Sequence, residues 1–224
     1  MGRVVKLSLP QRRLSGSIIL EPSKSLSNRA LIIHSLCGKS FDIHHLSTSD
    51  DTRVLQSMLT SGGDTLFAGH AGSSFRFMVA RACVGEKEVI VDGSTQLRRR
   101  PIGPLVRALQ ALGADIHYLQ KEGFPPLRIK PSPDFGNKAS EVTLSAGVSS
   151  QFISALLMIA PCLPNGMTLH LTEDPVSISY LHMTLRMMEY FGISHVWEGH
   201  TIRIEPGKYI AKSYAVEGDW SAAS

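Results

Sequence analysis

Cysteine is scarce in this 224-residue sequence, and long apolar runs are absent. The three cysteines, Cys37, Cys83 and Cys162, lie far apart and form no CxxC pair. This sparse, odd number argues against a disulfide framework or a cysteine-ligated zinc site, and it fits a reducing compartment. The longest apolar stretch, residues 155–163, contains a proline and is too short to cross a bilayer. Because the first residues carry charges where an export signal needs an apolar core, we expect a cytoplasmic protein with no membrane contact.

Recognisable metal and cofactor motifs are also missing. Nine histidines are present, but none has the spacing of a metal ligand pair, and the adjacent His44 and His45 would point to opposite faces of a strand. The sequence contains no Walker loop, dinucleotide-binding fingerprint or Ser-His-Asp arrangement. The formal net charge of +4 is a mild excess of base, which suits a small anionic ligand better than a long polyanion. Hydrophobic residues make up 43% of the chain, enough for a core in one large domain or two small ones.

Internal repetition is the most informative feature that the sequence does have. Two copies of one pattern begin with small-residue loops, AGSSF and VSSQF, that lead into apolar helix patterns. In each copy a β-rich run follows, and then a second amphipathic helix. This helix covers residues 101–112 in one copy and about 177–191 in the other. Both second helices stop at a glycine, Gly113 or Gly192, as a left-handed C-terminal cap requires. Paired strand signals close each copy, with the similar segments LRIKP and IRIEP.

A third, shorter copy precedes these two. Residues 23–29 open a helix that runs to about Cys37, a strand is expected over residues 41–44, and a second helix ends at Gly62. Most of the closing hairpin is missing from this copy. We predict an α/β fold of three repeated βαβαββ units, whose first helices start at one end of the molecule. The final VEGDWSAAS resembles the start of a fourth unit, so we interpret the chain as a fragment of a longer repeat protein.

The helix starts carry residue types that bind anions. Backbone N–H groups and the positive end of the helix dipole favour negative charge there. Lys24, Ser25 and Arg29 combine a point charge, a hydroxyl and a planar fork, and Ser25 and Arg29 share one helix face. Taken singly, each start also fits an ordinary N-cap or a solvated basic helix end. The convergence of several starts favours a ligand site.

Further candidates stand before later helices. Arginines 98–100 precede a helix with proline at its first position, and three adjacent cations cannot all face one site. Arg100 is nearest to the helix and is expected to point inward. Neutral donors at two other helix starts complete the candidates: Ser149, Ser150, Gln151, Ser177 and Tyr180.

These motifs together resemble the EPSP synthase family, in family order across essentially the whole chain. The resemblance is carried by SKSLSNRA from residue 23, SDDTR from 49, AGSSFR from 71, RPIG from 100, VSSQF from 148 and VEGD from 216. It implies one lobe of the inverse α/β barrel of the enolpyruvyl transferases. Residues 1–17 would be a strand segment belonging to or bordering the second lobe, residues 18–212 the three-repeat substrate-binding lobe, and residues 213–224 the crossover into a truncated second lobe.

The resemblance also implies a reaction. In this family a hydroxyl of shikimate 3-phosphate adds to the enol carbon of phosphoenolpyruvate, the methylene is protonated, and phosphate leaves. Lys24 and Arg100 would be the catalytic residues on this half and would hold phosphoenolpyruvate, with Gly72 against it. Shikimate 3-phosphate would be held by Ser25, Arg29, Ser149, Ser150, Gln151, Ser177 and Tyr180. No metal, organic cofactor or nucleic acid is implied, and the full-length enzyme of the shikimate pathway would be a monomer.

The chain departs from the family pattern in several places. His70 stands where the family usually has asparagine, Phe77 where a smaller residue is common, and the hairpin near Asp64 is missing. The family's second half, which supplies further charged groups, is absent, so we expect this fragment to bind shikimate 3-phosphate without turnover. Other interpretations are an enolpyruvyl transferase acting on UDP-N-acetylglucosamine, a regulatory remnant, and a non-catalytic anion- or RNA-binding module. Against RNA binding, no aromatic residues interleave with the arginine cluster to stack on bases.

Overall fold

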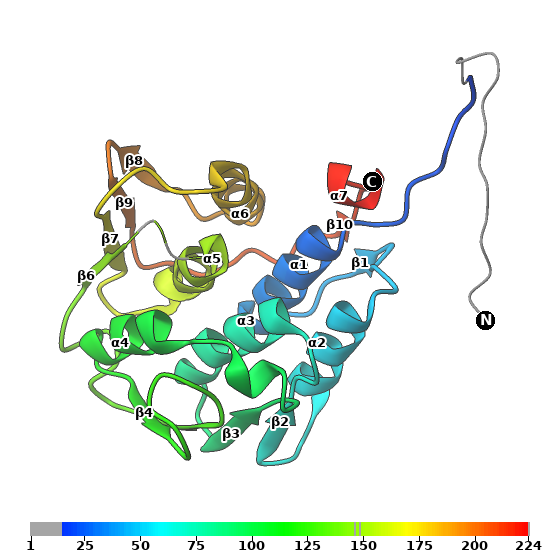
Figure 1. Ribbon diagram of the computed structural model, residues 1–224. Helices are drawn as coiled ribbons and strands as arrows, with labels where there is room; N and C mark the ends of the chain where they lie inside the picture. Colours follow the sequence, from blue (N-terminus) through cyan, green and yellow to red (C-terminus); the bar gives the residue numbers. More distant parts are fainter. Residues whose placement is uncertain (1–14, 146, 148, 224) are drawn as a thin grey trace.

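The computed structural model describes residues 15–145, 147 and 149–223. Three small sheets surround a group of packed helices, which gives the predicted α/β class (Figure 1). The helices of this part are α1 (Lys24–Leu36), α2 (Asp50–Thr60), α3 (Gly72–Cys83), α4 (Gly103–Ala111), α5 (Ser150–Ile159), α6 (Ile178–Tyr190) and α7 (Trp220–Ala223). The strands are β1 (Ile43–His44), β2 (Thr65–Phe67), β3 (Val89–Asp92), β4 (Asp115–Tyr118), β5 (Leu127–Lys130), β6 (Glu141–Leu144), β7 (Met167–Leu171), β8 (Val196–Glu198), β9 (Thr201–Ile204) and β10 (Tyr214–Ala215).

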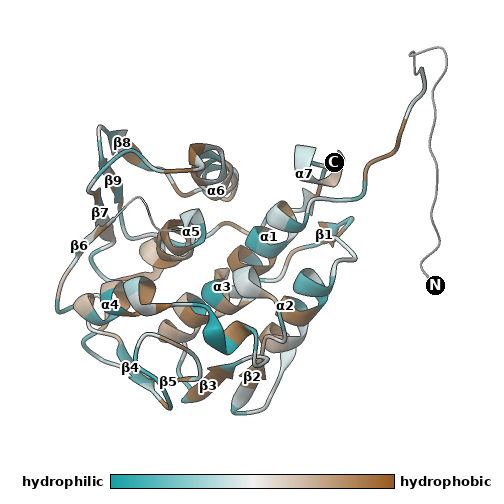
Figure 2. Ribbon diagram, in the orientation of Figure 1, coloured by the Kyte–Doolittle hydropathy of each residue, from teal (hydrophilic) through white to brown (hydrophobic). Residues whose placement is uncertain are grey.

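The two four-stranded sheets have the same construction. One has the order β2-β3-β5-β4 and the other β6-β7-β9-β8. In each, the first pair is parallel and the other pairs are antiparallel. The closing strands predicted from LRIKP and IRIEP form β5 and β9, where alternation buries Leu127 and Ile129 in one strand and Ile202 and Ile204 in the other. Each sheet therefore turns one apolar face toward the helices, and β2, β3 and β7 appear as brown segments in Figure 2.

The third sheet has two strands and includes a strand from the C-terminal segment. Of the strand expected over residues 41–44, only β1 forms, and it pairs in parallel with β10. The amide of Val216 donates to the carbonyl of His44 at 2.9 Å. β10 thus has the same parallel placement beside β1 that the opening strands β2 and β6 have beside β3 and β7.

The first residues of the chain were predicted to form a strand segment over residues 1–17. Residues 1–14 lie outside the part that the structure describes, and residues 15–17 are neither helix nor strand.

The core lies where α1, α3 and α5 pack against one another, and α5 is buried along most of its length. The second helix of each later copy ends as predicted, since Gly113 and Gly192 follow α4 and α6 with φ of 99° and 86°. Only glycine adopts these left-handed values without cost, which explains the stop. Among the described residues, no helix is long and apolar enough to cross a membrane.

Candidate functional site

A cavity of about 610 Å³ opens among the N-terminal ends of the helices. The starts of α1, α3 and α5 all border it, together with those of α6 and α7. The cavity brings together most of the candidates predicted from the sequence: Lys24, Ser25, Arg29, Ser150, Gln151, Ser177 and Tyr180. Ser149, Gly72 and Arg100 are not part of its lining.

Serine caps explain why these helices begin where they do. The Ser23 hydroxyl accepts a hydrogen bond from the Leu26 amide at 3.1 Å, and Ser149 accepts one from Gln151 at 3.3 Å. Ser149 therefore serves the start of α5. The first helix of the second copy, α3, differs from α1 and α5. It begins at Gly72 after Ala71, and no side chain caps its start. Its first-turn amides are left to other partners, which adds to the positive potential at this end.

The left-handed backbone of Ser177, with φ 63°, sets the start of α6. A non-glycine residue in this region costs about 1–2 kcal/mol, and such positions cluster at ligand sites. Tyr180 lies one turn further along the same helix, so Ser177 and Tyr180 both reach the cavity. The sequence spacing of these two residues predicted this arrangement.

Arg29 is the most unusual residue of the site, because it is a charged residue that is only 3% exposed. Its Nε donates to Thr184 Oγ1 at 2.7 Å, and one Nη donates to the Ser25 carbonyl at 2.9 Å. The other Nη donates to Ser154 Oγ at 3.1 Å and to the Tyr180 carbonyl at 3.4 Å. All these acceptors are neutral, and no carboxylate pairs with Arg29 within the described residues. A buried cation without a counter-ion is costly, so the site is built to receive an anion.

Burial lowers the pKa of Arg29 to about 10. This value still lies well above neutral pH, so the guanidinium keeps its charge under ordinary conditions. The neutral hydroxyls around it orient its fork without cancelling that charge. These acceptors engage four of its five N–H donors, so the remaining Nη N–H can donate a charge-assisted hydrogen bond to a carboxylate or phosphate in the cavity.

Lys24 provides a second cation at the start of α1. Its Nζ lies 3.5 Å from Asp51 Oδ1 on α2, and its side chain is 48% exposed. A contact of this length between partly exposed groups is weak, so an anion entering the cavity can compete for the ammonium.

A third cationic group lies beside Gly72. A Cβ atom at Gly72 would lie 2.8 Å from Arg100 Nη1, closer than real Cβ atoms approach other atoms, and 3.0 Å from Arg76 Nη1, which is tighter than most such contacts. Glycine at this position therefore lets both guanidinium groups approach the start of α3. The pKa of Arg76 is lowered by burial and by the neighbouring charge of Arg100. Two guanidinium groups this close favour an anion between them or beside them.

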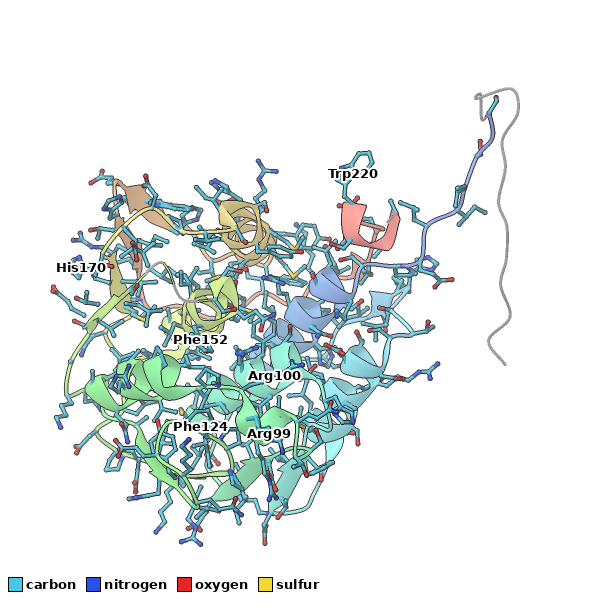
Figure 3. All side chains as sticks on the ribbon, in the orientation of Figure 1. Arg99, Arg100, Phe124, Phe152, His170 and Trp220 are labelled. Carbon is cyan, nitrogen blue, oxygen red and sulfur yellow. The ribbon has the colours of Figure 1, made fainter. Side chains whose placement is uncertain are left out.

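The three adjacent arginines have different surroundings, as expected. Arg98 donates through Nε to Asp92 Oδ1 at 2.9 Å, and it forms an ion pair with the same carboxylate. Arg99 and Arg100, both labelled in Figure 3, are both exposed. The sequence led us to expect that Arg100 points inward, but it lies beside Gly72 and does not line the cavity. The Asp92–Arg98 pair fixes the turn from which Arg100 extends.

The C-terminal segment contributes residues that sequence reasoning did not assign to the site. Asp219 lines the cavity, accepts a hydrogen bond from the Ser23 hydroxyl, and lies at the start of α7. The amide of Ser23 donates to the Glu217 carbonyl at 2.8 Å. The VEGD motif could have indicated these residues. However, nothing in the neighbouring sequence predicted that this motif contacts the start of α1.

We expect Ser23→Ala to lower the free energy of unfolding by about 1–2 kcal/mol, because α1 loses its cap and Asp219 loses its donor. Urea denaturation followed by circular dichroism measures this change. The control is Ser57→Ala at an exposed position on α2, which should change stability by less than about 0.5 kcal/mol. Equal stability of the Ser23→Ala and Ser57→Ala variants would contradict the role of the cap.

Other serines at the cavity were also missed. Ser47, Ser49 and Ser73 line it, and Asn28 forms part of its wall. Asn28 accepts a hydrogen bond from Thr52 Oγ1 at 2.8 Å, which ties α1 to α2. The motifs SKSLSNRA, SDDTR and AGSSFR contain Asn28, Ser49 and Ser73 but not Ser47, and only the packing shows that these residues face the cavity.

His70 is exposed, and its Nδ1 lies 2.8 Å from Ser94 Oγ. It does not line the cavity. Within residues 15–145, 147 and 149–223, no cluster of three or more His, Cys, Asp or Glu side chains could hold a metal ion.

The fold and the site define an α/β protein that gathers helix starts and cationic side chains around a cavity suited to a small anion. The model of the family EPSP synthase (3-phosphoshikimate 1-carboxyvinyltransferase) matches residues 53–224, and the chain belongs to this family. The resemblance seen in the sequence is therefore confirmed.

Relatives and solved structures agree with this assignment. A 3-phosphoshikimate 1-carboxyvinyltransferase of Bacteroides fragilis (strain YCH46) is 44% identical over 219 residues, covering 97% of this chain and 52% of the relative. The one from Salmonella schwarzengrund (strain CVM19633) is 34% identical and is covered over 56% of its length. An EPSP synthase structure from Acinetobacter baumannii has the same fold, with a TM-score of 0.80 at 19% identity, over 93% of this chain and 51% of that chain. The chain thus spans about half the length of the curated relatives it matches.

Proposed function

We propose that this chain is one lobe of an enzyme that transfers the enolpyruvyl group of phosphoenolpyruvate to shikimate 3-phosphate and releases phosphate. The single observation that carries the proposal is Arg29, a buried guanidinium held by neutral acceptors at the wall of a cavity. A small ligand with a phosphate, a carboxylate and ring hydroxyls matches this cavity, because the remaining lining contains several serines together with Gln151 and Tyr180.

In this proposal the two substrates occupy different ends of the site. Shikimate 3-phosphate lies against Arg29 and the starts of α5 and α6. Phosphoenolpyruvate lies nearer to Lys24, Arg100 and Gly72, where cations gather beside the uncapped start of α3. Lys24 and Arg100 neutralise its charge, and the chemistry is acid–base addition and elimination that needs no cofactor.

The repeat organisation belongs to the same proposal. We infer three related units, of which the second and third each run β-α-β-α-β-β around one four-stranded sheet. The first has α1, β1 and α2 and borrows β10. The proposed division remains a lobe over residues 18–212 with segments at both ends that lead to a second lobe, in a cytoplasmic enzyme that is monomeric when full length.

Titration calorimetry of the 224-residue chain tests the proposal. Shikimate 3-phosphate should bind, and shikimate, which lacks the phosphate, should bind at least about tenfold more weakly, because one charge-assisted contact contributes about 1.5–3 kcal/mol. UDP-N-acetylglucosamine is the control for the sister reaction and should give no heat above dilution. Binding of the sugar nucleotide, or equal affinity for shikimate and its phosphate, would overturn the assignment.

A further inference from the structure

Arg76 connects two parts of the site without lining the cavity. It lies on α3, and its Nη1 donates to Gln151 Oε1 on α5 at 2.7 Å. Its guanidinium carbon also lies 5.1 Å from the centre of the Phe152 ring, a cation–π contact that restrains the orientation of the guanidinium. Gln151, unlike Arg76, is part of the cavity wall.

The hydrogen bond decides which way the Gln151 amide faces. The oxygen and nitrogen of a glutamine side chain are interchangeable in shape, and only the surrounding hydrogen bonds fix their positions. A guanidinium has donors and no acceptor, so the atom of Gln151 that faces Arg76 must be the oxygen. The NH₂ group is then the branch left for other partners.

We propose that Arg76 is a positioning residue, which orients the Gln151 amide so that its NH₂ group is a donor to the anionic ligand in the cavity. This inference rests on the proposed binding of shikimate 3-phosphate. Without Arg76, the terminal torsion of Gln151 has a broad, roughly twofold profile, and the amide can turn its oxygen toward the ligand. An acceptor facing an anionic oxygen repels it.

The surroundings of Arg76 are unfavourable for a residue that only supports the fold. Its Nε is buried and has no hydrogen-bond partner among the described residues. Burial and the nearby charge of Arg100 both lower the pKa of Arg76, and no carboxylate pairs with it in this part of the chain. An unsatisfied buried donor beside a like charge indicates a residue kept for function.

A double-mutant cycle on the 224-residue chain tests the inference, with shikimate 3-phosphate affinity as the readout. Arg76→Met and Gln151→Met should each weaken binding by about tenfold, and the double variant should be no weaker than Gln151→Met alone. Arg76→Lys keeps a donor and should recover part of the loss. Arg81→Met is the control, because Arg81 lies on the same helix and donates to Ser35, away from the cavity. It should lower the unfolding midpoint and leave affinity unchanged.

Gln151→Glu separates orientation from folding. The carboxylate still accepts from Arg76 but has no donor for the ligand, so affinity should fall by at least about tenfold while the urea midpoint rises. With methionine at position 76, the same substitution should give no rise. Additive losses in the binding cycle would overturn the inference. If the parent chain does not bind shikimate 3-phosphate, the proposed function fails. In that case the urea midpoints still test the contact: an equal change on Gln151→Glu with arginine and with methionine at position 76 would overturn it.

Discussion

Replacing Arg29 with methionine should nearly abolish binding of shikimate 3-phosphate while leaving the fold intact. Removing one partner of a buried, hydrogen-bonded charge pair costs about 2–5 kcal/mol of affinity, which is more than about thirtyfold. The expected loss is at the upper end, because every acceptor around Arg29 is neutral and its charge remains available to the ligand. Titration calorimetry of the parent and variant chains measures the difference.

Stability should respond differently from affinity. Replacing a buried ionic group with an apolar side chain of similar volume is often neutral or stabilising, because the cost of desolvating the charge disappears. Thr184 Oγ1 can still bond to the Tyr180 carbonyl, at 2.8 Å, when the guanidinium is gone. We therefore expect Arg29→Met to change the free energy of unfolding by less than about 2 kcal/mol.

Two further variants complete this test. Arg29→Lys keeps the charge and loses the planar fork, so its affinity should lie between those of the parent and the methionine variant. Arg53→Met removes an exposed cation from α2 and should have no effect on binding. If Arg29→Met unfolds the chain, or binds the ligand as well as the parent does, then Arg29 supports the fold and the anion site lies elsewhere.

Local signals in the sequence predicted most of the helices and closing strands. Gly113 and Gly192 mark helix ends because a left-handed residue is needed there whatever the rest of the fold does. The alternation in β5 and β9 follows from the burial of one face of a sheet. Such features depend on a few neighbouring residues, which is why the sequence alone can indicate them.

Features that depend on distant packing were not predictable in this way. The pairing of β1 with β10 joins segments from opposite ends of the chain, and two-residue strands carry almost no periodicity. The contact between Arg76 and Gln151 exists only because α3 and α5 pack together. Likewise, a basic helix start at Arg29 predicts a solvent-facing cation as readily as a buried one, and only the three-dimensional packing distinguishes them.

The 224-residue chain alone should release no phosphate from phosphoenolpyruvate and shikimate 3-phosphate above the uncatalysed background. The chain covers 52% of its Bacteroides fragilis relative, and we propose that the reaction takes place between this lobe and a second one. The groups proposed to hold phosphoenolpyruvate are open to water, since the Lys24 side chain is 48% exposed and Arg100 is exposed. Water weakens each charge interaction several-fold relative to a closed site.

Joining the chain to a second half from a relative should give turnover. A chimera that joins this chain to the second half of the Bacteroides fragilis relative provides a covering lobe. In that chimera, Lys24→Ala and Arg100→Ala should each lower kcat/KM by more than about tenfold, or ~1.4 kcal/mol, because each removes a charge from the reacting anion. Arg99→Ala is the matched control: it removes the neighbouring exposed cation (Figure 3) and should leave the rate unchanged. A phosphate-release assay decides both points, and clear turnover by the 224-residue chain would mean that the catalytic groups lie within this lobe.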